Sequence, residues 1–441
     1  MKRSIKLAVA AAVALTSTAA FATNGDNLIA TGAKSLGMGG TGIAHYNGAE
    51  SATSNPALIT RGKGTLIVFG GTYFRPSVEV ETHTAAGASD NNVSKKSDAT
   101  NNIIPYITLT ENLDNGFAIG VSMYGSAGMG TDWRDGTGKY GAQTVGAASG
   151  DGKVGLYSMR SNLMLLKFSV PMAYSQSDWS VGVAPVIMYG ALDIAFQTAD
   201  TNSTGGIVGM TGVKDVGRGS SSDIGLGYEA GAAYTLKDLG VTAAARYQSA
   251  IMMEYKNQIS VAAAAFGYGT LAAHPAFSDK LEQPAELGFG LDWTQGDISL
   301  TADFKRIMWG SAAGYKDFGW ANQNVYALGA EYRIDKLALR AGYNYAKNPI
   351  QENHDTSTVS GNTNTHNDTL NAFNHVLFPA ITEKHYTVGA GYDFTKNVAA
   401  DVSFMYATSP KVTVDASSVA LGDLTVTNDQ MAVAANLNYK F

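Results

Sequence analysis

The most constraining feature of the sequence is an alternation of apolar with polar or small residues that recurs along most of the chain. The C-terminal stretch NDQMAVAANLNYKF places Met431, Val433, Leu437 and Tyr439 on one side of an extended backbone. The same period of two recurs around 384–394, 397–408, 336–347 and 286–294. The pattern predicts β-strands with one apolar face, and the opposite faces carry mainly Gly, Ser, Thr and Asn.

The composition indicates where such strands would be stable. Charged residues make up only 15% of the chain, whereas soluble proteins usually carry about 25%. No apolar run after the first 22 residues is long enough to cross a bilayer as a helix. A low charge fraction without helical spans fits a transmembrane β-barrel, whose strands show one face to lipid and the other to an aqueous lumen.

The connections between these segments alternate in length. DWTQGDI, RIDKL and DFTKNVA are tight turns, whereas 131–155, 197–221 and 346–380 are long and rich in Gly, Asn, Thr and Asp. Short turns on one side and long loops on the other are typical of outer-membrane barrels. We therefore predict an all-β fold, an antiparallel transmembrane barrel of about 14 strands. The strands expected are 64–81, 102–111, 116–131, 156–175, 179–197, 222–236, 240–260, 284–294, 297–309, 321–333, 336–347, 381–394, 397–411 and 424–441.

The first 22 residues have the three parts of a secretory signal peptide. Lys2, Arg3 and Lys6 precede a short apolar core, and Ala20-Phe21-Ala22 forms an A-x-A cleavage pattern. The apolar core is too short for a spanning helix, which needs about 20 residues. We predict that residues 1–22 are a signal peptide and that the mature chain begins at Thr23.

Several classes of function are disfavoured by what the chain lacks. It has no cysteine, so thiol nucleophiles and thiolate metal sites are excluded. A net charge of −6 without a basic cluster argues against a nucleic-acid partner. No GxSxG elbow or HExxH motif is present. We expect no catalytic residue, no metal and no cofactor. The histidines lie mostly in predicted loops, and only His385 is placed on a lumen face.

Residues 23–62, which precede the first predicted strand, show no sustained alternation. They are rich in Gly, Ala and small polar residues and contain the sequence SNPALIT immediately before the first strand. Irregular backbone at membrane depth is tolerated only where protein shields it from lipid. The segment would therefore either hang outside the barrel or fold inside it as a plug. Pro56 fixes its own φ and biases Asn55 towards extended conformations, so a rigid turn is expected there.

A second irregularity lies in the third predicted strand. YGSAGMG places Gly125, Gly128 and Gly130 where a continuous strand is expected. Glycine weakens strand pairing and often marks a bulge or bend. The alternative is a plain Gly-rich strand end that runs into a loop.

At these residues the chain resembles the FadL/TodX family of outer-membrane transporters for long-chain fatty acids and other hydrophobic compounds. The resemblance rests on LGMGGTGIA, on SNPALIT before strand one, and on FAIGVSMYGSAGMGTDW, EQPAELGFGLDW, RIMWG, YNYAKNPI and FPAITEKHYTVGAGYDF in order along the chain. It implies a barrel over 63–441 closed by an N-terminal hatch, residues 23–62, that contains the element Asn55, Pro56, Ala57 and Leu58. We expect the rigid turn of this element to gate the channel. The resemblance also implies a lateral opening at strand three, at Tyr124, Gly125, Gly128 and Gly130.

Other features are open to two interpretations. Aromatic residues near strand ends suggest interfacial girdles, although aromatics favour strands in any case; they are Tyr73, Phe74, Trp293, Trp309, Tyr332, Tyr343, Tyr345 and Phe441. Basic residues on or near strands could receive a carboxylate or merely solvate the lumen; they are Arg160, Lys167, Arg246, Lys305, Arg306 and Arg340. The loops 131–155 and 197–221 are expected to carry a first hydrophobic groove.

The function expected is passive uptake of a hydrophobic small molecule, a fatty acid, alkane or aromatic hydrocarbon, which leaves through the side of the barrel into outer-membrane lipid. We expect a monomer in the outer membrane of a Gram-negative bacterium. The C-terminal Phe441 resembles the signal by which the barrel assembly machinery recognises its clients. The alternatives are a general diffusion porin for polar solutes and a surface adhesin or structural barrel.

Overall fold

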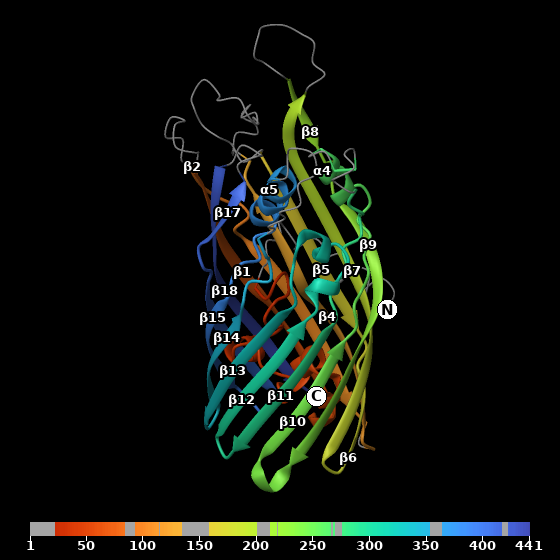
Figure 1. Ribbon diagram of the computed structural model, residues 1–441. Coiled ribbons are helices and arrows are strands. Elements are labelled where there is room, and N and C mark those ends of the chain that lie inside the picture. The colour runs from red at the N-terminus through yellow and green to blue at the C-terminus, as the bar shows by residue number, and fades with distance from the viewer. Residues whose placement is uncertain are drawn as a thin grey trace.

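The computed structural model describes residues 23–83, 93–113, 115–134, 158–200, 212–217, 219–265, 268–269, 276–352, 364–416 and 422–441. The predicted signal peptide, residues 1–22, lies outside them. The strands form one closed antiparallel sheet, seen as a tall barrel in Figure 1. The sheet has 18 strand segments. Four short segments each continue a longer strand, so the wall consists of fourteen continuous strands, which we call staves. The predicted barrel of about 14 strands is confirmed.

Each stave pairs with the next along the chain, and the last pairs with the first to close the barrel. The barrel closes where β1 pairs with β18, and this pairing begins at Leu66 and Lys440. The long strands are β1 (Thr65–His83), β3 (Asn102–Asn112), β4 (Phe117–Asp132), β5 (Arg160–Ser169), β7 (Trp179–Asp200), β9 (Ser221–Leu236), β10 (Val241–Gln248), β11 (Glu286–Gln295), β12 (Ile298–Ile307), β13 (Gln323–Ile334), β14 (Leu337–Ala346), β15 (Lys384–Asp393), β16 (Val398–Thr408) and β18 (Gly422–Lys440).

The four short segments are β2 (Val93–Lys96), β6 (Met172–Gln176), β8 (Gly212–Val216) and β17 (Val412–Ala416), which continue β3, β5, β9 and β16. The interruption between β5 and β6 falls at Val170 and Pro171, inside a strand predicted as continuous. Proline has no N–H for the ladder, so the break has a local cause.

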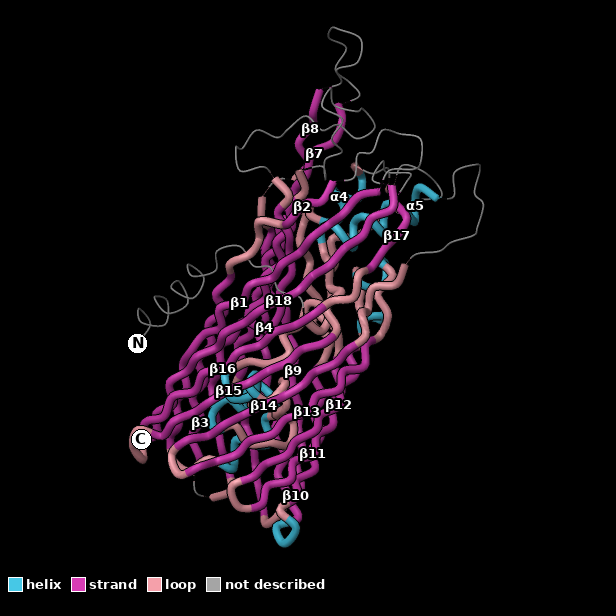
Figure 2. The backbone as a smooth tube through the Cα atoms, turned by 90° about the vertical axis from the view of Figure 1, so that its left-hand side faces the viewer, coloured by secondary structure: helices cyan, strands magenta, loops and turns pink. Residues whose placement is uncertain are grey.

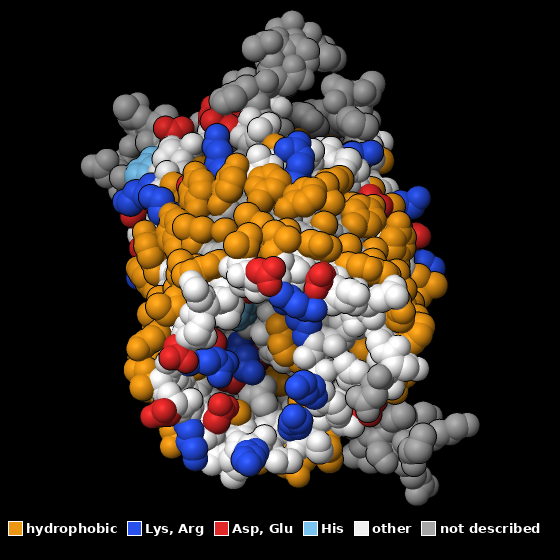
Figure 3. All heavy atoms as spheres, turned by 90° about the horizontal axis from the view of Figure 1, so that it is seen from below, with side chains coloured by type: hydrophobic (Ala, Val, Ile, Leu, Met, Phe, Trp, Pro, Cys, Tyr) orange, Lys and Arg blue, Asp and Glu red, His pale blue; other side chains and the backbone are white. Residues whose placement is uncertain are grey.

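The alternation seen in the sequence separates a lipid face from a lumen face. On β11, Phe289 and Leu291 are 50% and 56% exposed on the outer surface, whereas Asp292 between Leu291 and Trp293 is buried in the lumen. Figure 3 shows hydrophobic side chains around the wall and charged side chains gathered at the short-turn end. Among the described residues, no helix has the length and hydropathy that a membrane-spanning helix requires.

Two details differ from the sequence prediction. The strand predicted at 240–260 ends at Gln248, because the chain then turns over the lumen face of β9. Ile251 and Met253 lie against Gly225 and Gly227 at distances that leave no room for a Cβ. Trp309 was expected in an interfacial girdle but is fully buried within the barrel, as is the side chain of Phe74.

The N-terminal segment, residues 23–62, lies inside the ring of strands, as the red chain in Figure 1 and the helical turns within the barrel in Figure 2 show. Its short helices are α2 (Ala33–Gly37), η1 (Gly48–Glu50), α3 (Ser51–Ser54) and η2 (Pro56–Arg61). A turn at the short-turn end forms η3 (Lys237–Leu239). Towards the long connections the helices are α4 (Ile259–Ala264), η4 (Trp309–Ser311), η5 (Tyr315–Phe318), α5 (Asn364–Ala372) and the π-helix η6 (Phe373–Leu377).

Candidate functional site

The Asn-Pro-Ala turn is held by one fully buried side chain. Asn55 has an extended backbone (φ −156°, ψ 112°), and its side-chain oxygen accepts a hydrogen bond from the Ala57 N–H at 3.0 Å. Its amide nitrogen donates to the carbonyl of Ile43 at 2.8 Å and to the carbonyl of Ala245 on β10 at 3.3 Å. Pro56 occupies the first turn of η2, where its missing N–H costs nothing. The side chain thus caps η2 and ties it to both the N-terminal segment and the wall.

Glycines in the wall let this turn approach the strands. A Cβ at Gly231 on β9 would lie 1.9 Å from Asn55 Oδ1, and one at Gly182 on β7 would lie 2.6 Å from the Ala57 nitrogen. Ala57 and Leu58 are fully buried, and Leu58 packs in a cluster with Ile43 and small wall residues. Glycine within a strand is a sequence signal for such close backbone approach.

Further along, α2 and the turn after it rest on a second glycine surface formed by β13, β14 and β15. A Cβ at Gly342 would lie 2.1 Å from the Gly39 nitrogen, and one at Gly329 would lie 2.6 Å from the Met38 carbonyl. Thr387 accepts a hydrogen bond from the Gly39 N–H at 2.9 Å. The N-terminal segment is therefore seated on two separate parts of the wall, one at β7, β9 and β10 and the other at β13, β14 and β15.

Charged contacts fix the lower part of the segment. Glu50 is buried and accepts hydrogen bonds from Asn436 on β18 and from the backbone N–H of Lys34. Burial raises the pKa of Glu50 to about 8, against the opposing effect of the nearby Lys34 ammonium. His45 Nδ1 lies 2.6 Å from Asp292 Oδ1 on β11. Glu50 therefore couples the position of the segment to protonation as well as to packing.

Strand β4 is irregular where the sequence predicted it. Its ladder with β3 ends at the pair Tyr106 and Tyr124, and its register with β5 shifts between Gly125 and Ala127. The extra residue, Ser126, makes a β-bulge, which bends a strand and redirects its side chains. A Cβ at Gly125 would lie 2.5 Å from the side chain of Ile104 on β3.

Gly128 and Gly130, by contrast, lie within a regular ladder with β5, opposite Met164 and Asn162. Of the four residues predicted at strand three, the structure places Tyr124 and Gly125 at the irregularity. Gly128 and Gly130 lie further along β4, where β4 no longer pairs with β3.

The N-terminal residues of the described chain occupy the place beside β4 that β3 has left. The Leu28 N–H donates to the Ser126 carbonyl at 3.2 Å, and the Gly128 N–H donates to the Asp26 carbonyl at 3.0 Å. Asn27 and Ala127 form an isolated antiparallel bridge. We call residues 23–28 the tail. The tail thus forms a short ladder with β4 at its bulge.

The side chain of Asp26 anchors the tail to the interior. Its Oδ2 accepts hydrogen bonds from the hydroxyl of Tyr315 in η5 and from Gln283 Nε2, the latter at 3.1 Å. Burial raises the pKa of this carboxyl to about 6, although both hydrogen bonds act in the opposite direction. Gly25, with φ +69°, lies on the ring of Trp309, where a Cβ would be 2.5 Å from the ring carbons.

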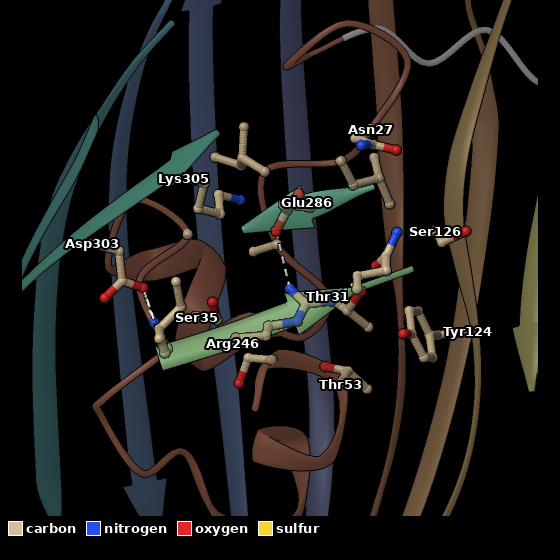
Figure 4. A pocket seen from close by; sticks show the side chains of 18 of the residues that line it. Asn27, Thr31, Ser35, Thr53, Tyr124, Ser126, Arg246, Glu286, Asp303 and Lys305 are labelled. Carbon is tan, nitrogen blue, oxygen red and sulfur yellow. Dashed lines mark hydrogen bonds and ion pairs between the residues drawn. The ribbon is translucent and has the colours of Figure 1, made fainter. Parts of the chain in front are cut away.

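A polar cavity of about 70 Å³ lies between the N-terminal segment and residues of β4, β5 and β10 to β12 (Figure 4). Arg246 lies 3.2 Å from both Glu286 and Glu229, and Lys167 lies 3.3 Å from Glu229. The backbone N–H groups of Gly42 and Ile43 donate to Asp303 Oδ2 at 2.8 and 3.0 Å.

Most of the basic residues predicted on the strands are therefore paired with wall carboxylates. Arg160 pairs with Asp193, and Arg340 pairs with Glu331 and Asp401. Arg306 is instead exposed and donates to Asn324. Lys305 lines the cavity.

The upper lumen is apolar. One continuous cluster joins the inner faces of β4, β5 and β7 to buried residues of the connections, including η4, η5, α5 and η6. Ala127 and Met129 on β4 belong to it, so the cluster extends to the bulge. The sequence placed a hydrophobic groove instead in the loops 131–155 and 197–221, which lie mostly outside the described residues. The inward folding of 249–265 and 364–381 was not predicted.

The part of the chain that the structure describes holds no cluster of metal-ligating side chains. His385 lies on the lumen face, as predicted, and is fully buried. Within those same residues, no three His, Asp or Glu side chains gather in a way that could hold a metal ion.

The comparisons with known proteins agree with this architecture. A family model described as outer membrane protein transport protein (OMPP1/FadL/TodX) matches residues 9–363. The chain belongs to this family. Its place is therefore the outer membrane of a Gram-negative bacterium, and its relatives by family are transport channels rather than enzymes.

A FadL homologue from Pseudomonas aeruginosa is 15% identical with a TM-score of 0.66, covering 95% of this chain and 100% of that one. The toluene transporter TodX from P. putida is 19% identical with a TM-score of 0.65, covering 94% of this chain and 99% of that one. At such identities the likeness shows the fold alone. An uncharacterized Chlorobium limicola protein, from the 5′ region of a phosphoenolpyruvate carboxykinase gene, is 42% identical over 95 residues, 21% of this chain and 43% of that protein.

Proposed function

We propose that this family member takes up hydrophobic small molecules without an energy source, binds them in the apolar upper lumen and releases them sideways through the wall at β4. The observation that carries the proposal is the ladder between the tail and β4. A segment paired there by two backbone hydrogen bonds occupies the place of a wall strand, and it can leave without breaking the closure of the barrel.

The apolar route supports this direction of transport. Ala127 and Met129 connect the upper cluster to the bulge, so a hydrophobic molecule could reach the lipid without entering water. Transfer of apolar surface into water costs about 25 cal/mol per Å². A route that ends in the bilayer avoids that cost, whereas a route through the lower lumen would meet the paired charges around Glu229.

The N-terminal segment would act as the hatch of this channel. Asn55, Pro56, Ala57 and Leu58 fix its lower turn against β7, β9 and β10, while the tail covers the break at Tyr124 and Gly125. A channel of this kind works as a monomer, because the exit needs free lipid beside β4. Phe441, 70% exposed at the end of the barrel, remains available to the assembly machinery. Solved relatives by fold include a toluene transporter and a monoaromatic hydrocarbon channel, CymD.

The test is uptake of radiolabelled oleate and toluene by cells that lack their own transporter. Cells would express the intact protein or an Asn55→Ala/Pro56→Ala variant at equal surface abundance. We expect entry of at least one compound with the intact protein and loss of that entry with the variant. If neither enters while small sugars do, the protein is a diffusion porin. If deletion of residues 23–62 leaves its activity at the cell surface intact, an adhesin or structural role replaces the proposal.

A further inference from the structure

A pocket of about 650 Å³ lies at the short-turn end of the barrel, and we call it the rim pocket. Lys34, Gly48 and Ala49 line it from the N-terminal segment. The rest of its lining comes from the wall, at the lower ends of β1, β15, β16 and β18 and in the turns before β14 and β16. A ligand that fills the rim pocket therefore contacts the N-terminal segment and the wall at once.

The wall residues of the rim pocket belong to both faces of the sheet. Ile67, Tyr439 and Val398 are cross-strand partners on β1, β18 and β16, so their side chains share a face. Tyr439 is exposed on the outer surface, and this row therefore faces lipid. Leu66 and Lys440, the adjacent pair, point to the other face, and Leu66 packs in a cluster inside the barrel. The pocket thus runs around the lower edge of the wall, from an apolar outer surface to the lumen.

Exposed aromatic rings flank the outer part of the pocket. Tyr392 and Phe394 form one edge-to-face pair with centroids 5.2 Å apart, and Tyr439 and Phe441 form another at 4.7 Å. Aromatic side chains of membrane proteins are enriched at the level of the lipid head groups. Since the long connections of an outer-membrane barrel face the outside, this end of the wall meets the inner leaflet.

The charged side chains of the lining are mostly basic. Asp393 is the one carboxylate that the described residues place there, against four lysines: Lys34, Lys336, Lys396 and Lys440. Asp393 lies 3.9 Å from Arg333, whereas the last three lysines make no ion pair within the described part of the chain. Figure 3 shows Lys and Arg side chains around the hollow at this end of the barrel. Excess positive charge beside an apolar surface favours an amphipathic anion.

Lys34 extends this positive charge to the N-terminal segment. Its backbone N–H is bound to Glu50 at 3.3 Å, and its side chain, 18% exposed, lies 3.9 Å from Asp401 on β16. The ammonium also lies beside η1, because a Cβ at Gly48 would be 3.6 Å from its Nζ. An anion held at this ammonium is therefore in contact with α2 and close to η1.

We propose that the rim pocket binds an anionic phospholipid of the inner leaflet, and that the bound lipid stabilises the seated N-terminal segment. The phosphate lies among the lysines, and the acyl chains lie against the outer row of Ile67, Tyr439 and Val398. A free anion would leave that apolar row uncovered, whereas a phospholipid matches both parts of the pocket. The inference goes beyond the proposed function, since it concerns the seating of the segment and holds whatever compound the channel carries.

The first test measures lipid binding to the intact protein by native mass spectrometry, with phosphatidylglycerol and phosphatidylcholine of identical acyl chains. We expect phosphatidylglycerol to be retained preferentially. Lys336→Gln/Lys396→Gln, at two exposed turn residues, should weaken its binding by about five- to 25-fold, because each lysine near an anionic lipid surface contributes up to about fivefold. Lys237→Gln is the matched control, since this lysine lies in another turn of the same end and pairs with Asp178 at 2.8 Å.

Equal retention of the two lipids, or an equal loss of phosphatidylglycerol in the control, overturns the inference. The same spectra report the oligomeric state. A dimer that the double variant loses would make a second copy of the chain the occupant of the rim pocket, and the proposal would fail.

The second test measures hydrogen exchange in nanodiscs of phosphatidylcholine, with and without phosphatidylglycerol. The peptides that cover residues 33–50 should exchange several-fold more slowly with phosphatidylglycerol, and Lys336→Gln/Lys396→Gln should remove this protection. Unchanged exchange, or protection that persists in the variant, overturns the link between the lipid and the segment. Equal protection by inorganic phosphate added to phosphatidylcholine nanodiscs would make the ligand a free anion and refute the lipid site. None of these outcomes depends on which compounds the channel transports.

Discussion

Replacing Asn55 by alanine should release the lower turn of the N-terminal segment without disturbing the wall. The side chain caps η2 through the Ala57 N–H and donates to the carbonyls of Ile43 and Ala245. Loss of such a cap costs about 1 kcal/mol, and each of the two further bonds contributes about 0.5–1.5 kcal/mol. Since Asn55 is fully buried, solvent does not replace these bonds directly.

The sum is about 2–4 kcal/mol in the free energy that separates the seated from the released turn. Because 1.4 kcal/mol corresponds to a factor of ten, the released population should rise by about 30- to 700-fold. Hydrogen exchange followed by mass spectrometry, on protein in detergent, measures this directly. The peptides that cover residues 52–62 should exchange faster by up to that factor, while those from β11 to β14 should not change.

Asn397→Ala is the matched control. This asparagine also makes a side-chain bond, to the Lys440 carbonyl at 2.7 Å, but it lies in an exposed turn between β15 and β16. It should leave exchange at 52–62 unaltered. If Asn55→Ala also leaves those peptides unaltered, the turn is held by packing alone, and the assignment of Asn55 as its anchor is wrong.

Three further predictions concern other contacts of the segment. Gly231→Ala should release the same turn as Asn55→Ala does, because the new Cβ would lie 1.9 Å from Asn55 Oδ1. Faster hydrogen exchange of the peptides that cover residues 52–62 checks this. Gly71→Ala is the control, because the atom nearest to its new Cβ would be 3.4 Å away. Burial raises the pKa of Glu50 to about 8 in the seated segment, so protonation of this carboxyl stabilises the seated state relative to the released one. The population of the seated state should therefore be highest below about pH 4.5. It should fall as the pH rises to 8 and stay constant above that. Glu50→Gln should flatten this profile, read from exchange at 48–54 after correction for the intrinsic rate; a slope retained in that variant would assign the effect to another group. Tyr315→Phe removes a hydrogen-bond donor to Asp26. Since one such bond contributes about 1 kcal/mol net, the amide hydrogens of Leu28 and Gly128 should exchange about fivefold faster. Unchanged exchange at these amides would mean that Gln283 alone holds the carboxyl.

The barrel could be predicted because a lipid-facing wall leaves a simple signal. Each strand must place apolar side chains outward at every second residue, so fourteen staves were recognisable from residues such as Phe289 and Leu291. Chain closure and the order of pairing follow from short turns between neighbours. Strand ends were less predictable, since β10 ends where tertiary contacts of Ile251 and Met253 begin.

The interior was predicted only in part. The turn at Asn55 and the irregularity after Tyr124 carry local signals, a proline after asparagine and a run of glycines. The glycines at 182, 231, 329 and 342 carried a signal that was not used, although glycine within a strand marks a close backbone approach. Trp309 was misplaced because a buried and a girdle tryptophan look alike in sequence. The apolar cluster of the upper lumen was missed because its residues come from segments distant in the chain.

The most direct test of the account is to lock the tail onto β4. The chain has no cysteine, so an Asn27→Cys/Ala127→Cys pair, placed across the isolated bridge between these residues, would form a single defined disulfide. A pair at Ala243 and Leu291, neighbours on β10 and β11, would lock a part of the wall that does not move. We predict that oxidation of the first pair abolishes uptake of hydrophobic compounds, that reduction restores it, and that the second pair has no effect in either state. Unchanged uptake with the tail locked would contradict the exit at β4.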